Sequence, residues 1–267
     1  MFSIDEENIQ KLIGISKDAG YEIMDIYNTN FEVVSKDDQS PLTKADILSN
    51  KIICDSLKRI TPNIPILSEE SSTISFHDRS KWSYYWLVDP LDGTKEFVNK
   101  NGEFTTNIAL IKNNAPIFGI IHVPSRNETY WGSKCEGSFM LANDNIKKSL
   151  RVRSSKPNSE LRIVSSRSHP SGDLKLLLEK LDNYELVGIG SSLKFCLIAK
   201  GEADCYPRLG PTCEWDTAAG EIIAISAGAD VVTLDDMPLD YNKKDLLNPY
   251  FLVSNNQEIK KRILSLI

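Results

Sequence analysis

Residues 86–94 read WLVDPLDGT, a hydrophobic run that passes directly into two carboxylates three residues apart. The aromatic and branched residues at its start predict a strand. Pro90 has no N–H and keeps Asp89 out of the helical region, so we expect the strand to end at Asp89. Asp92 and Gly93 then predict a tight turn, because glycine adopts positive φ without steric cost.

Two carboxylates at this spacing can face one small volume in a turn. The backbone carbonyl of Leu91, which lies between them, can face the same volume. Such hard oxygen ligands suit Mg²⁺, so the segment is a candidate metal site. Asp-Pro and Asp-Gly are also common in ordinary turns, and the segment alone leaves a purely structural turn open.

Acidic residues stand at three other predicted element ends. They are Glu69 and Glu70 after the apolar run 63–67, Asp46 at the start of a helix over 46–60, and Asp216 at the start of a helix over 215–227. If these acids converge, they require cations, because like charges about 4 Å apart repel strongly in a poorly hydrated site. Spacing alone does not establish convergence, and Asp216 could equally be a helix N-cap.

The composition argues against several classes of protein. The 267 residues carry 31 Lys and Arg against 37 Asp and Glu, a net charge of −6, which disfavours a nucleic-acid polymer as partner. No apolar run approaches the ~18–20 residues of a membrane-spanning helix, and the acidic N-terminus is unlike a signal peptide. Five cysteines without a CxxC pair disfavour a disulfide scaffold or a zinc site, so we expect reduced cysteines and a cytoplasmic protein.

The order of predicted elements indicates a layered α/β fold in two halves. The first half begins with helices and continues with closely spaced β-like runs, which predict an antiparallel meander. The helices cover 5–28 and 46–60, a polar loop covers 35–41, and the runs cover 106–111, 116–122, 128–132 and 138–141. From residue 161 onward strands and helices alternate. The polar segment 142–159 separates the two patterns, so we expect an N-terminal α+β metal-site half at 1–145 and a C-terminal α/β substrate half at 146–267 within one compact unit.

Three sequence blocks carry a resemblance to a known family. They are SEES at 68–71, DPLDGT at 89–94 and WDTAAG at 215–220. In this order they resemble the inositol monophosphatase superfamily of Mg²⁺-dependent, lithium-sensitive phosphatases, and the resemblance covers essentially the whole chain. It implies the alternating αβαβα sandwich of that family.

The resemblance also implies a set of site residues. The implied cofactor is two or three Mg²⁺ ions, with Li⁺ or Ca²⁺ expected to inhibit. The implied metal ligands are Glu69, Asp89, the Leu91 carbonyl, Asp92 and Asp216. Asp46 and Thr94 resemble the pair that orients and deprotonates the attacking water, and Glu70 is expected to support the ligand beside it.

The subfamily follows from three further segments. Residues 95–110 read KEFVNKNGEFTTNIAL and resemble the 3′(2′),5′-bisphosphate nucleotidase branch in its bacterial form, as do 164–169 and 206–216. The implied reaction removes the 3′-phosphate of adenosine 3′,5′-bisphosphate, and in some members of its phosphosulfate analogue, in sulfur assimilation or nucleotide recycling. The implied substrate contacts are Gly93, Thr94, Ser166, His169, Gly190, Ser192, Lys194 and Asp216.

Several alternatives remain open at this point. Lys194 can meet the non-scissile 5′-phosphate or be a solvated surface lysine, and His169 can bond the ribose or base or be an ordinary loop histidine. Arg208 is a weaker candidate for a phosphate contact. The competing functions are an inositol mono- or polyphosphate 1-phosphatase on the same fold and a non-catalytic nucleotide or metal sensor. The sequence leaves monomer or homodimer, and peripheral inner-membrane association, undecided.

Overall fold

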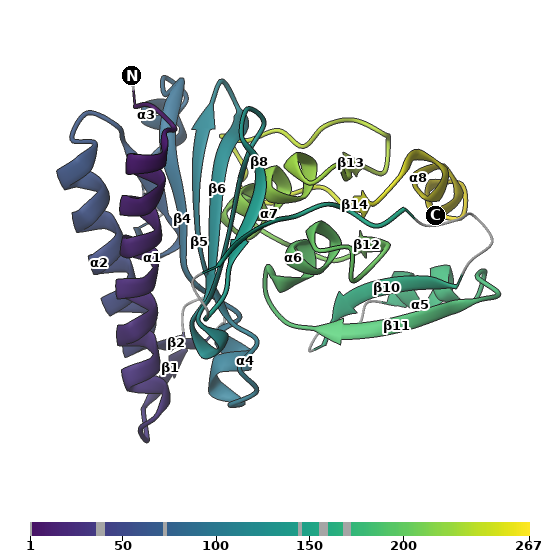
Figure 1. The fold of residues 1–267 in the computed structure, drawn as a ribbon, viewed down its shortest axis with the longest axis horizontal. Coiled ribbons are helices and arrows are strands. Elements are labelled where there is room, and N and C mark those ends of the chain that lie inside the picture. The colour runs from purple at the N-terminus through teal and green to yellow at the C-terminus, as the bar shows by residue number, and fades with distance from the viewer. Residues whose placement is uncertain (1, 36–40, 72–73, 144–145, 155–159, 168–171) are drawn as a thin grey trace.

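The computed structural model describes the chain except for residues 1, 36–40, 72–73, 144–145, 155–159 and 168–171. Most of the predicted loop at 35–41 and His169 therefore lie outside the described residues. Five layers follow one another across the molecule (Figure 1): two helices, a seven-stranded sheet, two central helices, a five-stranded sheet and two outer helices. This order confirms the predicted αβαβα sandwich.

The first layer consists of α1 (Glu6–Tyr27) and α2 (Lys44–Ile60), close to their predicted bounds. Their apolar faces pack on the first sheet, where Leu12 and Ile53 share a buried cluster with Trp86. Thr43 caps α2, and Asp46 closes a capping box by accepting from the Thr43 N–H at 2.7 Å. The start of α2 is thereby fixed by its own sequence.

The first sheet has the order β3-β4-β5-β6-β7-β8-β9. Its strands are β3 (Ile66–Ser68), β4 (Tyr84–Asp92), β5 (Thr105–Lys112), β6 (Ala115–Val123), β7 (Glu128–Ser133), β8 (Gly137–Leu141) and β9 (Lys147–Ser149). β3 pairs with β4 in parallel, and every later neighbour is antiparallel, which confirms the predicted meander. Short elements fill the connections: β1 (Val33–Ser35), β2 (Pro41–Thr43), η1 (Glu69–Ser71), α3 (Phe76–Arg79), α4 (Thr94–Val98) and η2 (Pro124–Arg126).

The predicted end of β4 at Asp89 is wrong, because the strand continues to Asp92. Asp89 pairs with Asn107 and Asp92 pairs with Thr105, and the register shifts between these two pairs. Pro90 lies in this irregularity, so its missing N–H falls where the hydrogen-bond ladder is already interrupted. The predicted turn follows directly, with Gly93 at φ +88°.

The second sheet has the order β11-β10-β12-β14-β13. Its strands are β10 (Leu161–Ser166), β11 (Tyr184–Ile189), β12 (Cys205–Arg208), β13 (Asp230–Thr233) and β14 (Phe251–Ser254). The helices of this half are α5 (Gly172–Leu178), α6 (Leu193–Ala199), α7 (Glu214–Ser226) and α8 (Gln257–Leu264). β10 runs parallel to β11 and β12, so these three strands end at the same edge of the sheet.

Helix α7 lies between the two sheets and packs closely on the first one (Figure 1). A Cβ at Gly119 of β6 would lie 2.6 Å from the Ala219 carbonyl oxygen, so only glycine fits there. Gly132 of β7 makes a similar approach, with a Cβ 2.9 Å from the Ile223 Cα. This close packing of α7 on β6 and β7 sets the position of the α7 N-terminus, and with it of Asp216, relative to the end of β4.

Within the described ranges, no helix combines the length and the apolar content needed to cross a bilayer.

Candidate active site

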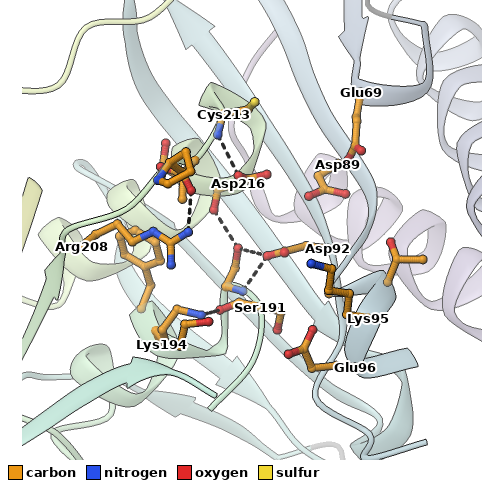
Figure 2. A pocket seen from close by; sticks show the side chains of 18 of the residues that line it. Glu69, Asp89, Asp92, Lys95, Glu96, Ser191, Lys194, Arg208, Cys213 and Asp216 are labelled. Atoms are coloured by element: carbon orange, nitrogen blue, oxygen red, sulfur yellow. Dashed lines mark hydrogen bonds between the residues drawn. The ribbon is translucent and has the colours of Figure 1, made fainter. Parts of the chain in front are cut away.

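A cavity of about 370 Å³ lies where the end of β4 meets the second half of the chain. Both halves contribute polar side chains to its lining (Figure 2). From the sites predicted above, the lining includes Glu69, Asp89, Leu91, Asp92, Gly93, Thr94, Ser166, Ser192, Lys194 and Asp216. The structure therefore brings residues from the ends of β3, β4 and β10 and from the starts of α4, α6 and α7 into one volume.

The acids of this cavity form a tight cluster. One carboxylate oxygen each from Asp89, Asp92 and Asp216 lies within 4.8 Å of the others. Burial raises the pKa of Asp89, and the neighbouring charges of Glu69, Asp92 and Asp216 raise it further. Burial, then Asp92 and Glu69, raise the pKa of Asp216 to about 8. These carboxylates are hard oxygen donors, and their negative charges repel one another. They fit a divalent cation, because its charge relieves that repulsion.

Each of the three aspartates is fixed by the protein through one oxygen. Asp89 accepts from the Leu91 N–H at 3.0 Å, and Asp216 accepts from the Cys213 N–H at 2.8 Å. Asp92 accepts from both the N–H and the hydroxyl of Ser192 at 2.6 Å. Among the described residues no donor reaches the second oxygen of any of the three, so one oxygen of each remains for a ligand.

The N-cap interpretation of Asp216 is wrong. Cys213 occupies the N-cap of α7, and Asp216 stands three residues later, where its side chain completes a capping box. Asp46 holds the same position in α2. The two helices thus present an acid from their first turns toward the site, by the same local geometry.

Asp46 reaches the cavity through Thr94. It is 1% exposed and is absent from the lining, but its Oδ1 lies 3.2 Å from the Thr94 hydroxyl. The other oxygen of Asp46 accepts from the Thr43 N–H and hydroxyl at 2.7 Å each. A hydroxyl that donates to Asp46 can accept from water, so the pair can move a proton away from the cavity.

The surface-lysine interpretation of Lys194 is wrong, because this residue is 6% exposed. Its amine donates to the Ser191 carbonyl at 2.6 Å and lies 5.5 Å from the centre of the Tyr206 ring. Burial lowers its pKa to about 8. The amine is therefore held away from water, where its electrostatic attraction to an anionic group is strongest.

Besides Asp46, two predicted residues that the structure describes lie outside the cavity lining. Gly190 is buried behind it, where a Cβ would lie 2.5 Å from the Glu96 Cγ. Glu70 stands next to Glu69 in η1.

The lining also contains residues that the sequence analysis did not assign, among them Ser191, Glu96 and Leu247, and it contains Arg208, which the sequence offered as a weaker phosphate contact. Figure 2 shows Arg208 and Lys194 on the side of the cavity opposite Glu69 and Asp89. Arg208 ends β12, and its guanidinium donates to the Pro211 carbonyl at 2.5 Å. The end of a parallel strand at this sheet edge was a usable signal for Arg208. Leu247 forms only an isolated β-bridge with Cys213, outside the named strands, so no periodicity points to it.

Sequence and structure comparisons point to the same relatives. Residues 5–267 match the sequence model of the Inositol monophosphatase family. The 3′(2′),5′-bisphosphate nucleotidase CysQ of Escherichia coli (strain K12) is 45% identical over 249 residues, which cover 92% of this chain and 99% of that protein. The crystal structure of CysQ from Bacteroides thetaiotaomicron superposes with a TM-score of 0.83 at 36% identity, covering 95% of this chain and 99% of that one. The Thermotoga maritima IMPase superposes with a TM-score of 0.80 at 22% identity, covering 97% and 96%, which supports the fold alone.

Proposed function

Because the chain belongs to the inositol monophosphatase family, we propose that its acidic pocket removes the 3′-phosphate of adenosine 3′,5′-bisphosphate and leaves AMP. The observation that carries this proposal is the pairing of an aspartate cluster on one wall with Lys194 and Arg208 on the other. A bisphosphate can place its scissile phosphate at the aspartate cluster and its other phosphate beside Lys194 and Arg208. The curated relatives that cover nearly the whole chain carry the name 3′(2′),5′-bisphosphate nucleotidase.

The proposed cofactor is Mg²⁺, as two or three ions. Their ligands would be Glu69, Asp89, the Leu91 carbonyl, Asp92 and Asp216, which line the cavity together. When bound, Mg²⁺ neutralises the carboxylates, polarises the scissile phosphate and supports the leaving ribose oxygen.

The chain's own residues supply the proton transfer and the substrate orientation. Thr94 accepts a proton from the attacking water while its own proton passes to Asp46. Gly93 and Ser192 meet the scissile end of the substrate, and Lys194 meets the 5′-phosphate. Ser166 at the end of β10 and His169, three residues later in the sequence, are the proposed contacts to the nucleoside, and Gly190 contributes through the shape of the loop behind the lining.

The paired substrate assay tests this function. Phosphate release is measured with Mg²⁺ from adenosine 3′,5′-bisphosphate and from inositol 1-phosphate, and we expect a strong preference for the nucleotide. A strong preference for the inositol ester would replace the proposal with the inositol phosphatase. Absence of turnover together with tight nucleotide binding would favour a sensor. We also expect inhibition by millimolar Li⁺ in the presence of Mg²⁺.

Lys194→Met makes the same test specific to the second wall. We expect it to raise KM for the bisphosphate by about tenfold or more, since it removes a buried charge partner of one phosphate. p-Nitrophenyl phosphate has only the scissile phosphate, so its hydrolysis serves as the matched control and should change little.

We further propose that the partner is a small nucleotide, not a nucleic-acid polymer, which a cavity of about 370 Å³ suits. The proposed location is the cytoplasm, supported by five cysteines that are unpaired in the structure, and the proposed state is monomer or homodimer. The proposed division at residue 145 separates most metal ligands from most nucleotide contacts.

A further inference from the structure

Glu103 joins the two halves of the chain beside the cavity. It lies in the connection between α4 and β5, is 8% exposed and does not line the cavity itself. Its carboxylate accepts from the Arg167 Nε at 2.8 Å, the Arg167 Nη2 at 2.7 Å and the Gly190 N–H at 2.8 Å. All three donors belong to the second half of the chain, so the Glu103 carboxylate links the second half to the first.

Arg167 extends this contact across two strands. It directly follows Ser166 at the end of β10, and its Nη2 also donates to the Gly188 carbonyl of β11 at 2.6 Å. A planar guanidinium can hold a carboxylate with two N–H groups and still reach a carbonyl, which an ammonium group cannot do with the same geometry. The ends of β10 and β11 are thereby tied to each other and to Glu103.

The backbone of Glu103 is also tightly enclosed. A Cβ at Gly93 would lie 3.0 Å from the Glu103 carbonyl oxygen, and a Cβ at Gly190 would lie 2.8 Å from the same atom. Gly93 ends the turn with the aspartates, and Gly190 precedes the loop with Ser192. The Glu103 carbonyl oxygen therefore lies against both glycines, while its carboxylate holds the Gly190 N–H in place.

Two hydrogen-bonded contacts hold the loop after Gly190, one inside the aspartate cluster and one outside it. Ser192 is hydrogen-bonded to Asp92, inside the aspartate cluster. Gly190 is hydrogen-bonded to Glu103, outside it. Between the two points the Ser191 carbonyl accepts from Lys194. The Glu103 contact therefore holds this loop from outside the cluster, whereas the Ser192 contact holds it from inside.

We propose that Glu103 and Arg167 are a positioning pair that sets the distance between the aspartate wall and the Lys194 wall, and so selects substrates that span both. The inference rests on the proposed function for its substrate. It predicts that the pair matters for a nucleotide bisphosphate and much less for an ester that occupies only the aspartate side. Neither residue is placed in contact with the substrate.

Glu103→Gln tests the pair, because it removes the charge and keeps the size. We expect KM for adenosine 3′,5′-bisphosphate to rise about tenfold while kcat changes less than about threefold. The kcat/KM for p-nitrophenyl phosphate should stay within about twofold of the wild type, since this ester does not span the cavity. Arg167→Met should reproduce this pattern and Arg167→Lys should weaken it, because lysine keeps the charge without the fork. The control is Glu185→Gln, an exposed acid on the neighbouring β11, which should leave both substrates unchanged.

Hydrogen exchange supplies a readout that does not depend on the reaction. In Glu103→Gln and Arg167→Met we expect amides 186–194 to exchange at least about fivefold faster, with amides of β6 unchanged. The double variant should be little worse than either single variant, as expected for one shared contact. Unchanged KM together with unchanged exchange would overturn the proposal, and so would equal losses for the two esters. A wild type that hydrolyses only p-nitrophenyl phosphate would defeat the proposed function alone, and the exchange result would then decide the pair. If Glu103→Gln does not fold, Arg167→Lys decides by the same measurements.

Discussion

Ser192 donates both its N–H and its hydroxyl to the same oxygen of Asp92, each at 2.6 Å, across 100 residues of sequence. The hydroxyl also lies 2.8 Å from the Asp216 carbonyl and accepts from Asn107 at 2.9 Å. One serine thus connects the end of β4, the neighbouring β5 and the start of α7. The orientation of Asp92 is set from the opposite half of the chain.

This geometry predicts the effect of Asp92→Asn. The amide oxygen must face Ser192 to keep both hydrogen bonds, so the NH₂ group faces the other carboxylates and cannot bind a cation. We expect kcat with Mg²⁺ to fall more than about tenfold, because losing a ligand costs several kcal/mol of transition-state stabilisation. The melting temperature should not fall, since the substitution relieves charge repulsion. The control is Asp182→Asn, which removes an exposed acid. Retention of more than about a tenth of the wild-type kcat would contradict the role of Asp92.

Thr94 offers a test of proton transfer. Its hydroxyl lies 3.2 Å from both the Asp46 Oδ1 and the Leu91 carbonyl. Thr94→Ala removes the hydroxyl, and we expect kcat to fall about 10²- to 10³-fold. Thr94→Ser keeps it and should stay within about tenfold of the wild type. Single-turnover rates would measure both, and similar rates for the alanine and serine variants would exclude the proposed path.

Two glycines of α1 should respond in opposite ways to the same substitution. Nothing lies within 4 Å of a Cβ at Gly14, so Gly14→Ala should stabilise the fold by about 0.5–1 kcal/mol through helix propensity. A Cβ at Gly20 would lie 2.6 Å from the buried His122 ring, so Gly20→Ala should destabilise it by about 1–3 kcal/mol. Urea unfolding measures both. Equal effects would show that α1 does not pack on β6 as described.

His122 predicts a loss of stability in acid. Burial lowers its pKa from 6.5 to about 4, with a smaller contribution from Lys17. Above pH 6.5 the ring is neutral in both folded and unfolded chains and has no effect. As the pH falls from 6.5 toward 4 the unfolded chain takes up a proton that the folded chain does not, so stability falls by up to about 3 kcal/mol.

The matched variant for this prediction is His122→Gln, which is neutral at every pH. Urea unfolding of both proteins between pH 7 and 4.5 should give a smaller loss for the variant, because all other titrating groups are shared. Parallel curves would show that His122 does not carry the acid sensitivity.

Local sequence predicted most of the fold. The helices at 5–28 and 46–60 are confirmed because each buries one periodic face, which a single segment reveals. The meander strands are confirmed although the central ones are buried on both faces, because short β-like runs between turn residues mark them locally. The layered order also followed, since alternating strands and helices have few packing solutions. The acids at four element ends were visible for a related reason: strand ends and helix starts are marked locally by turn and capping residues.

Features that depend on distant residues were not predictable in the same way. The extension of β4 past Pro90 depends on the register with Asn107 and Thr105 of β5, which no local pattern encodes. The position of α7 depends on the close contact of Gly119 with Ala219, two residues a hundred positions apart. The Glu103–Arg167 contact is equally long-range, and a single sequence contains no record of such pairings.

The central position of α7 has a consequence for how activity arises during synthesis and folding. Asp216 joins Asp89 and Asp92 only after α7 is enclosed between the two sheets, so the cluster cannot exist in a chain that has folded only its first sheet. A ribosome-bound chain that stops before residue 216 therefore lacks the complete cluster and its activity, even if its N-terminal layers have folded. Recovery of turnover in a refolding experiment consequently reports the docking of α7, whereas circular dichroism reports the formation of helices and strands.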